Sequence, residues 1–356
     1  MKKHLHNLAR IRSGEYRDTT SGIFLDRNER VIPFDEVTLE KMFYRLSQIQ
    51  FNLYPDVLPF YKKLSNWIGL KEEKIYVTEG VSGAIKSLIE TLALTGDNVV
   101  FPTPTFALYP VYCQMFNLEY RMVGYSNNYT LDIEALLGSI DDRTSLVFLP
   151  NPNNPIEGTL DLNSVSIIAK HCQKKNTYLV IDEVYYHYGG PNAIPLIDMF
   201  ENVFIMRSFS KAFGLAGIRV GYLLGTTKNI DYVSKTRTGY ETNSVSMEIA
   251  SFFIDNFSIV EGYIKSVKEG LQYLKGELED FGLEYNGGNT GNYLFVNFHD
   301  ENLANTVVAN LRKKGIYIRG EWPAPFSTGI SITGAPKNIM KIFFEEFTNE
   351  YQKLKD

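Results

Sequence analysis

Short apolar stretches alternate with longer stretches of helical periodicity between about residue 57 and residue 225. The expected strands are runs rich in Val, Ile, Leu, Phe and Tyr, at 98–102, 119–125, 145–150, 177–184, 202–208 and 219–225. Between them, apolar side chains recur three and four positions apart over 81–94, 106–116, 132–140 and 162–175, which predicts amphipathic helices. Strands that alternate with helices predict an α/β fold, with a mostly parallel sheet sandwiched by helices.

The pattern changes after about residue 245. A long helical stretch to about residue 280 is followed by expected strands at 293–298, 316–320 and 329–333 and by helices at 301–314 and at the C-terminus. We predict a smaller α+β domain here, which the N-terminal segment joins. The expected domains are a large domain over 41–249 and a small domain over 1–40 and 250–356.

Composition and charge narrow the class of protein. The chain has 356 residues, of which 44% are apolar and 22% charged, which is typical of a folded protein with more than one domain. A net charge of −5 without a cluster of Lys and Arg argues against a general nucleic-acid binder. No apolar run approaches the roughly 18 residues that cross a bilayer, and the start of the chain lacks the apolar core of a signal peptide.

The cysteines indicate a reducing compartment, and neither the cysteines nor the histidines indicate a metal site. The two cysteines, Cys113 and Cys172, each lie inside an expected helix, so neither a disulfide framework nor a zinc site is indicated. The five histidines do not show metal-ligand spacing. We therefore expect a cytoplasmic protein without a bound metal.

Polar side chains follow three of the expected strands. They are Asn151, Asn153 and Asn154 after 145–150, Asp182 and Tyr185 within and after 177–184, and Ser208 and Lys211 at and after the end of 202–208. Because ligands bind at the carboxyl ends of parallel strands, we expect these side chains to share one site. A lysine amine is nucleophilic only when its charge is suppressed, by burial or by a neighbouring cation, which makes Lys211 a candidate Schiff-base former.

Together these side chains meet the demands of pyridoxal phosphate. An acid beside the ring nitrogen would keep a pyridinium protonated, and a serine, an arginine and a helix N-terminus would hold the phosphate. Taken singly, each residue has an ordinary structural interpretation: Lys211 as a surface charge, Asp182 as a helix cap, Tyr54 and Phe106 as core aromatics. Their joint order and spacing favour the cofactor.

Residues 208–222, SFSKAFGLAGIRVGY, resemble the Ser-x-Ser-Lys … Leu-Ala-Gly-x-Arg-x-Gly motif of the fold-type I pyridoxal-phosphate aminotransferases. From LDRNE at 25–29 to its end, the chain is similar to the histidinol-phosphate aminotransferase branch of that family. The resemblance implies a pyridoxal-phosphate-dependent aminotransferase that acts on small molecules. It also implies a homodimer with shared active sites.

The resemblance implies a role for each candidate residue. Lys211 would form the Schiff base with the cofactor and move the proton between the substrate Cα and the cofactor, and Asp182 would pair with the pyridine nitrogen. Tyr185 and Asn154 would hydrogen-bond the 3′-oxygen of the ring. The phosphate would be held by the side chains of Ser208 and Arg219 and the backbone of Gly80, Val81 and Ser82. Phe106 would stack on the ring, and Tyr54 would reach the phosphate in the neighbouring subunit.

The substrate positions depart from the family pattern. The family commonly carries a carboxylate-binding arginine in an Arg-x-Ser/Thr-x-Gly strand, and Ile330 aligns with it, so we expect Ile330 to face a substrate without a carboxylate. Ile156 and Glu157 replace a smaller pair, and we expect them beside the pocket. The predicted substrate-binding residues are Arg319, which matches a branch arginine, Arg237 and Asn28.

These positions predict the reaction. The predicted function is transfer of an amino group between glutamate or a similar donor and a small phosphorylated carbonyl compound. One alternative is the histidinol-phosphate aminotransferase of histidine biosynthesis. The other is a pyridoxal-phosphate-dependent decarboxylase of a phospho-amino acid, which would use the same residues.

Overall fold

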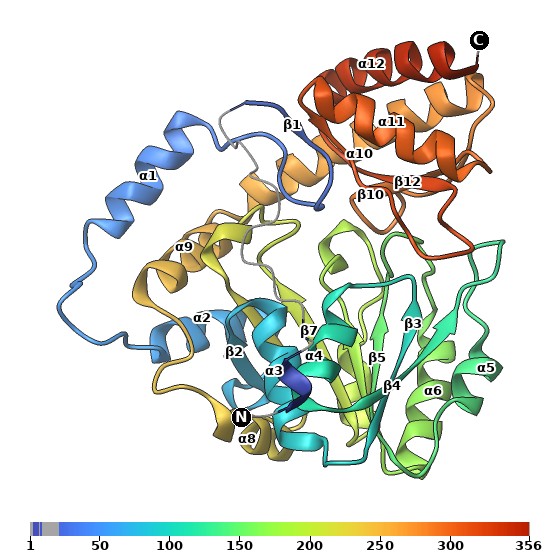
Figure 1. The fold of residues 1–356 in the computed structure, drawn as a ribbon. Coiled ribbons are helices and arrows are strands. Elements are labelled where there is room, and N and C mark those ends of the chain that lie inside the picture. Colours follow the sequence, from blue (N-terminus) through green and yellow to red (C-terminus); the bar gives the residue numbers. More distant parts are fainter. Residues whose placement is uncertain (1–2, 7, 9–20, 356) are drawn as a thin grey trace.

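The computed structural model describes residues 3–6, 8 and 21–355, and within them a central seven-stranded sheet has the order β2-β8-β7-β6-β5-β3-β4 (Figure 1). The strands are β2 (Ile75–Thr78), β3 (Asn98–Thr103), β4 (Glu119–Gly124), β5 (Thr144–Pro150), β6 (Tyr178–Asp182), β7 (Val203–Ser208) and β8 (Gly221–Leu224). All neighbours pair in parallel except β8, which is antiparallel to both β2 and β7. The predicted α/β fold with a mostly parallel sheet is confirmed.

The helices around this sheet bury it on both faces. They are α2 (Leu58–Ile68), α3 (Gly80–Leu92), α4 (Leu108–Phe116), α5 (Ile133–Gly138), α6 (Leu162–Lys174), α7 (Ile194–Met199), α8 (Thr227–Val233) and α9 (Ser244–Asp255). Along β5, Leu146 and Phe148 belong to the apolar cluster under α3 and α4, whereas Val147 and Leu149 belong to the cluster under α5 and α6. Burial of both faces explains the continuous apolar runs, because neither face can accept polar residues.

The small domain packs three helices on an antiparallel sheet of order β12-β10-β9 (upper right in Figure 1). Its elements are α10 (Phe257–Asp280), β9 (Glu284–Gly287), β10 (Tyr293–Asn297), α11 (Glu301–Lys313), β11 (Ile316–Tyr317), β12 (Gly329–Thr333) and α12 (Lys337–Lys355). Strand β1 (Ile23–Phe24) pairs in parallel with β11, which ties this part of the N-terminal segment to the small domain.

The contacts of the N-terminal segment and of α9 favour domain boundaries other than those predicted. Lys3–Leu5 contacts α4, where the ring of His4 hydrogen-bonds the carbonyl of Met115 at 3.1 Å, so this segment lies on the large domain. Helix α1 (Glu36–Leu46) packs on α9, and the predicted cut at 249/250 falls inside α9. We propose that the boundary lies at Asn256, between α9 and α10. Residues 1–2, 7, 9–20 and 356 of the predicted small domain lie outside the described residues.

Some predicted elements shift. The strand predicted at 219–225 begins at Gly221, because Arg219 has a positive φ of 55° that a strand cannot contain. The short β2 was not predicted, since four buried residues carry no periodic signal. In the part of the chain described, no helix has both the length and the apolarity that a membrane span requires.

Candidate active site

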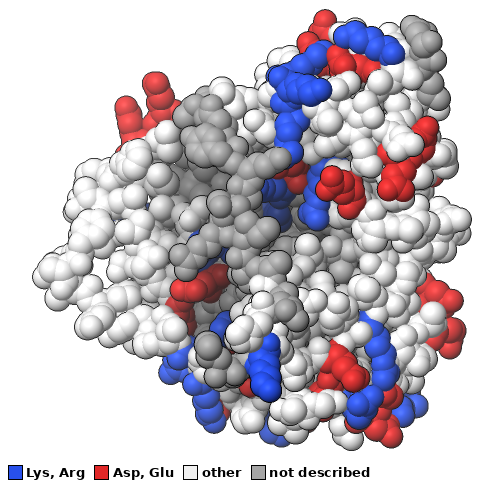
Figure 2. All heavy atoms as spheres, viewed as in Figure 1, with Lys and Arg blue, Asp and Glu red and all other residues white. Residues whose placement is uncertain are grey.

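A cavity of about 580 Å³ opens where β5, β6 and β7 end, below the small domain. Its lining includes most of the predicted site residues: Asn28, Val81, Ser82, Phe106, Asn154, Asp182, Tyr185, Ser208, Lys211, Arg219 and Arg319. Figure 2 shows Lys and Arg side chains between the two domains with acidic side chains beside them, whereas the left part of this face is largely uncharged. Tertiary folding therefore brings residues that are up to 291 positions apart in the sequence into one site, from Asn28 to Arg319 (319 − 28).

Lys211 is placed as a reactive amine. It follows β7, and its Nζ donates a hydrogen bond to the carbonyl of Arg27 at 2.9 Å. Burial lowers the pKa of Lys211 to about 8, although the charges of Glu29 and Asp182 oppose the shift. A substantial fraction of this amine is therefore neutral near physiological pH, as a nucleophile must be.

This pKa predicts how fast the cofactor-free protein captures pyridoxal phosphate. Below pH 8 the amine carries a proton, so the capture rate should fall about tenfold per pH unit, and above it the rate should level off. Stopped-flow absorbance of the cofactor measures this rate, and Lys211→Ala provides the baseline. A rate that does not change through this pH range would contradict the assignment of Lys211.

Asp182 ends β6 and is buried at the base of the cavity. Its Oδ2 accepts a hydrogen bond from the hydroxyl of Tyr109 at 2.7 Å, and its Oδ1 accepts one from the backbone N–H of Val184 at 3.2 Å. Burial raises the pKa of Asp182 to about 6, while Tyr109 and Val184 act to lower it. Sequence reasoning missed Tyr109, whose only signal is its place one helical turn after Phe106.

Tyr185 and Asn154 offer polar groups to the same space. Asn28 Nδ2 donates to the Tyr185 hydroxyl at 2.8 Å, and burial raises the pKa of that hydroxyl, so it stays protonated. The Nδ2 of Asn154 is buried without a hydrogen-bond partner among the described residues. An unsatisfied buried donor costs free energy, so a ligand oxygen that accepts from it would be stabilising.

The start of α3 forms an anion site with Arg219. Gly80 has φ +65°, and a Cβ placed there would lie 2.7 Å from the guanidinium of Arg219, so the two groups are in close contact. Glu79, which precedes the helix, makes no side-chain cap, which leaves the first N–H groups for another acceptor. Ser82 and Ser208 line the same end of the cavity. A helix N-terminus beside an arginine and two hydroxyls fits a phosphate.

The residues present fit pyridoxal phosphate as a set: an amine for its aldehyde, an acid for its ring nitrogen, an orphaned amide for its ring oxygen and an anion site for its phosphate. The class I and II aminotransferase family model matches residues 20–335. The chain belongs to this family. As a member, it is a pyridoxal-phosphate-dependent aminotransferase.

Relatives of this aminotransferase are consistent with the predicted branch. Histidinol-phosphate aminotransferase 1 of Bacillus thuringiensis is 29% identical over 85% of this chain and 84% of its own length. The histidinol-phosphate aminotransferase of Pyrococcus furiosus is 29% identical over 86% of this chain and 84% of its own length. The crystal structure of the Sinorhizobium meliloti histidinol-phosphate aminotransferase with pyridoxal 5′-phosphate shares the fold, with a TM-score of 0.90, 22% identity and coverage of 99% and 98%.

Three predicted residues of the aminotransferase do not line the cavity of the single chain: Gly80, which lies against Arg219, Tyr54 and Arg237. Tyr54 is 81% exposed, and its ring stacks on that of Tyr240 at 4.9 Å. Arg237 is exposed, with its Nη1 donating to the carbonyl of Ser234 at 3.0 Å. Tyr54 remains a prediction for a second subunit, and Arg237 is not brought to the substrate in this chain.

The expectation that Ile330 faces the substrate is wrong. Ile330 is fully buried and pairs with Val296 inside the small-domain sheet, whereas its neighbour Ser331 lines the cavity. Because side chains alternate along a strand, Gly329 and Ser331 share the cavity face and Ile330 points away. At Gly329 a Cβ would lie 2.2 Å from the ring of Phe295. The Phe295 ring therefore occupies the space that a side chain at this position would need.

Ile156 and Glu157 do not flank the substrate either. Ile156 is fully buried in the core. The Glu157 carboxylate accepts backbone hydrogen bonds from Asn289 at 3.0 Å, from Gly291 at 2.5 Å and from Thr290. It therefore joins the loop after β5 to the small domain, and the expectation of a pocket residue is wrong.

A buried ion pair supports the loops under the site. Arg207 Nη2 lies 2.7 Å from Glu183 Oε2, with side chains 5% and 1% exposed, and its guanidinium stacks 3.7 Å over the ring of Tyr186. The Arg207→Met variant should lower the free energy of unfolding by about 3–5 kcal/mol, because it leaves Glu183 buried without a counter-charge. Urea denaturation measures this loss.

Two further variants separate this effect from general damage. Adding Glu183→Gln to Arg207→Met removes the unpaired charge and should recover part of the loss. Lys175→Met breaks an exposed pair with Asp142 and should cost no more than about 1 kcal/mol. Equal losses for Arg207→Met and Lys175→Met would contradict the prediction.

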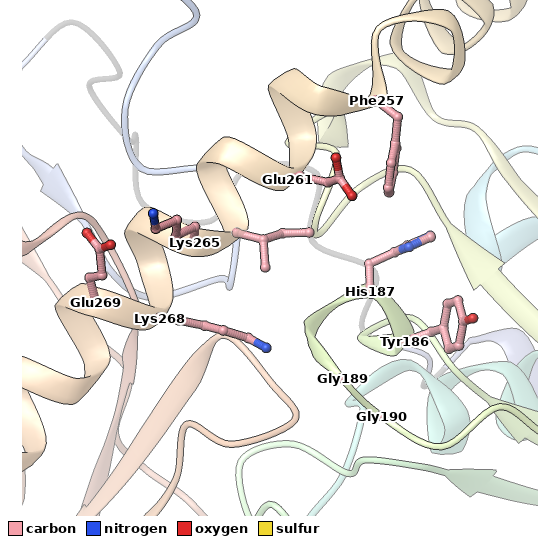
Figure 3. Close-up of a pocket in the computed structure, with 10 residues that line it drawn as sticks. Tyr186, His187, Gly189, Gly190, Phe257, Glu261, Lys265, Lys268 and Glu269 are labelled. Atoms are coloured by element: carbon pink, nitrogen blue, oxygen red, sulfur yellow. The ribbon is translucent and has the colours of Figure 1, made fainter.

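A second cavity, of about 690 Å³, lies between α10 and the loop at 186–190 (Figure 3). There His187 lies beside Phe257 of α10, and Lys268 extends from α10 toward the loop that holds Gly189. It shares no lining residue with the cavity at Lys211, so we do not assign the reaction to it. Among the described residues, no group of three or more His, Cys, Asp or Glu side chains could hold a metal.

Proposed function

We propose that this aminotransferase moves an amino group between an amino-acid donor such as glutamate and a small phosphorylated carbonyl compound. Arg319 is the observation that supports this proposal. It lines the cavity, and its guanidinium stacks 4.2 Å over the ring of Trp322, which fixes its plane. Burial lowers the pKa of Arg319, so its charge is poorly solvated and an anionic group of the substrate would stabilise it.

The residues divide the chemistry among them. Pyridoxal phosphate supplies the electron-withdrawing ring that the amino transfer needs. Lys211 would hold its aldehyde carbon and would carry the proton to and from the substrate Cα. Asp182 would hold the ring nitrogen, Asn154 and Tyr185 would orient the ring oxygen, and Arg319 would bind the far end of the substrate.

A second candidate substrate is histidinol phosphate, favoured by the names of the relatives. Histidinol phosphate is also a phosphorylated amine without a carboxylate, so one arginine at the far end suits it equally. The two candidates differ in the size of the group next to the phosphate.

Half-reactions test the proposal. Glutamate should convert the cofactor absorbance to that of the amino form, and phosphorylated ketones and aldehydes should reverse it. The panel should include a three-carbon ketone phosphate, the ketone of histidinol phosphate, and the unphosphorylated form of each. Equal reaction of phosphorylated and unphosphorylated acceptors would contradict the proposal, and carbon dioxide release from a phospho-amino acid without a keto acid would indicate decarboxylation instead.

We also propose that the enzyme is a homodimer with shared sites. Large apolar side chains are exposed on α1, on the segment before α2 and at the first residue of α2, with α1 and the segment extending from the body at the left of Figure 1: Val37, Phe43, Tyr44, Phe51, Leu53, Tyr54 and Leu58. Such a patch is typical of an interface. Sedimentation should give twice the chain mass of 40.6 kDa, and a monomer that retains full activity would contradict the proposal.

We infer a cytoplasmic location from the thiols. Cys113 and Cys172 are both buried and free, which suits a reducing compartment. The proposed partners are the small-molecule substrates and a second copy of the chain, without nucleic acid or membrane.

A further inference from the structure

Tyr109 connects two parts of the cofactor site that lie on different elements. It sits fully buried in the first turn of α4, with its ring stacked on Phe148 (centroids 4.8 Å apart, planes at 13°). The ring of Phe106 meets it edge-on, at 5.6 Å and 83°. Its hydroxyl donates to Asp182 Oδ2 at 2.7 Å. The ring packing fixes the direction of that hydroxyl, because a clamped tyrosine ring leaves only the O–H bond free to rotate.

The carboxylate of Asp182 needs such a donor. Burial favours its protonated form, and a protonated carboxyl has no negative charge to pair with a pyridinium N–H. The titratable groups around it are Tyr109 from α4, Glu183 and Tyr185 beside it after β6, and Lys211 after β7. Burial keeps the pKa of Tyr109 well above its usual value, so this hydroxyl remains a donor throughout the working pH range.

We propose that Tyr109 is a positioning residue that keeps Asp182 ionised and directs its free lone pairs toward the ring nitrogen of the cofactor. Phe106 contacts both the cavity and the Tyr109 ring, so the residue that faces the cofactor ring and the acid that holds its nitrogen move as one unit. The inference rests on the cofactor assignment, not on the identity of the amino acceptor.

The pH dependence of cofactor affinity tests this role. In the parent protein, the affinity of the cofactor-free form for pyridoxal phosphate should fall as the pH falls through about 6, where Asp182 gains a proton. Tyr109→Phe keeps the ring but loses the hydrogen-bond donor. The fall in affinity at low pH, the acid limb of the profile, should therefore occur about one to two pH units higher. The change near pH 8, which belongs to Lys211, should not move.

A matched control is available in Tyr125. This buried tyrosine makes no hydroxyl hydrogen bond among the described residues, and Tyr125→Phe should leave the acid limb in place. Incorporation of 3-fluorotyrosine at position 109 makes the hydroxyl a stronger donor and should move the limb downward. An acid limb that is the same in the parent, the Tyr109→Phe protein and the fluorinated protein would overturn the proposal.

A cofactor analogue with carbon in place of the ring nitrogen separates positioning from packing. With pyridoxal phosphate, Tyr109→Phe should weaken binding by about tenfold or more near pH 6. With the carbon analogue it should weaken binding by less than about twofold, because no ring N–H meets Asp182. Equal losses with both molecules would show a purely structural role and overturn the proposal, whereas failure of every phosphorylated acceptor would affect only the proposed substrate.

Discussion

Replacing Lys211 with alanine should reduce kcat by roughly four orders of magnitude or more, because one residue is assigned both the covalent capture of the cofactor and the proton transfer at the substrate Cα. The variant should also lose the visible absorbance that the bound cofactor shows in the parent protein. Single-turnover kinetics with added pyridoxal phosphate measure the first effect, and an absorbance spectrum measures the second.

Lys268→Ala is a matched control for this variant. It removes a lysine from the second cavity, and its kcat and absorbance should stay within about twofold of the parent, since Lys268 does not line the cavity at Lys211. If Lys211→Ala retained turnover comparable to Lys268→Ala, the central assignment would be wrong.

Replacing Arg319 with methionine should raise KM for a phosphorylated acceptor by roughly 100-fold or more, equivalent to about 3 kcal/mol, because the phosphate would be desolvated without its partner. Arg319→Lys should recover only part of this loss, since an ammonium cannot make two parallel hydrogen bonds to a phosphate. Reaction with an unphosphorylated acceptor should change little. Steady-state kinetics with paired acceptors measure all three outcomes.

Arg237→Met tests the other arginine that was predicted to bind the substrate. The structure places Arg237 outside the cavity of its own chain, so this variant should leave KM within about twofold of the parent. An unchanged KM in Arg319→Met together with a raised KM in Arg237→Met would transfer the role to Arg237, acting from another part of the assembly.

Much of the fold was predictable because its strands are buried on both faces. The runs that became β5, β6 and β7 have apolar centres, and Asn154, Asp182 and Lys211 lie at or shortly after their ends. Parallel strands expose their carboxyl ends at one edge, so the order of these residues was enough to predict a shared site. The comparison with the family then confirmed the cofactor and the type of reaction.

The substrate side was less predictable because it depends on which way a side chain points. Ile330 and Ser331 are adjacent in sequence, yet strand alternation sends one into the core and the other to the cavity. An alignment error of a single residue therefore reverses the interpretation. Glu157 was misplaced for a related reason, since its backbone partners lie more than 130 residues away.

The sequence by itself determined the α/β class, the cofactor chemistry and the loops that carry it, because periodicity and short motifs are local properties of the chain. Only the tertiary structure decided that Tyr109 donates to Asp182, that Phe295 fills the space at Gly329 and that Arg237 lies away from the cavity. Those contacts join distant segments, and their geometry depends on how helices and sheets pack. No pattern within a single segment records that packing.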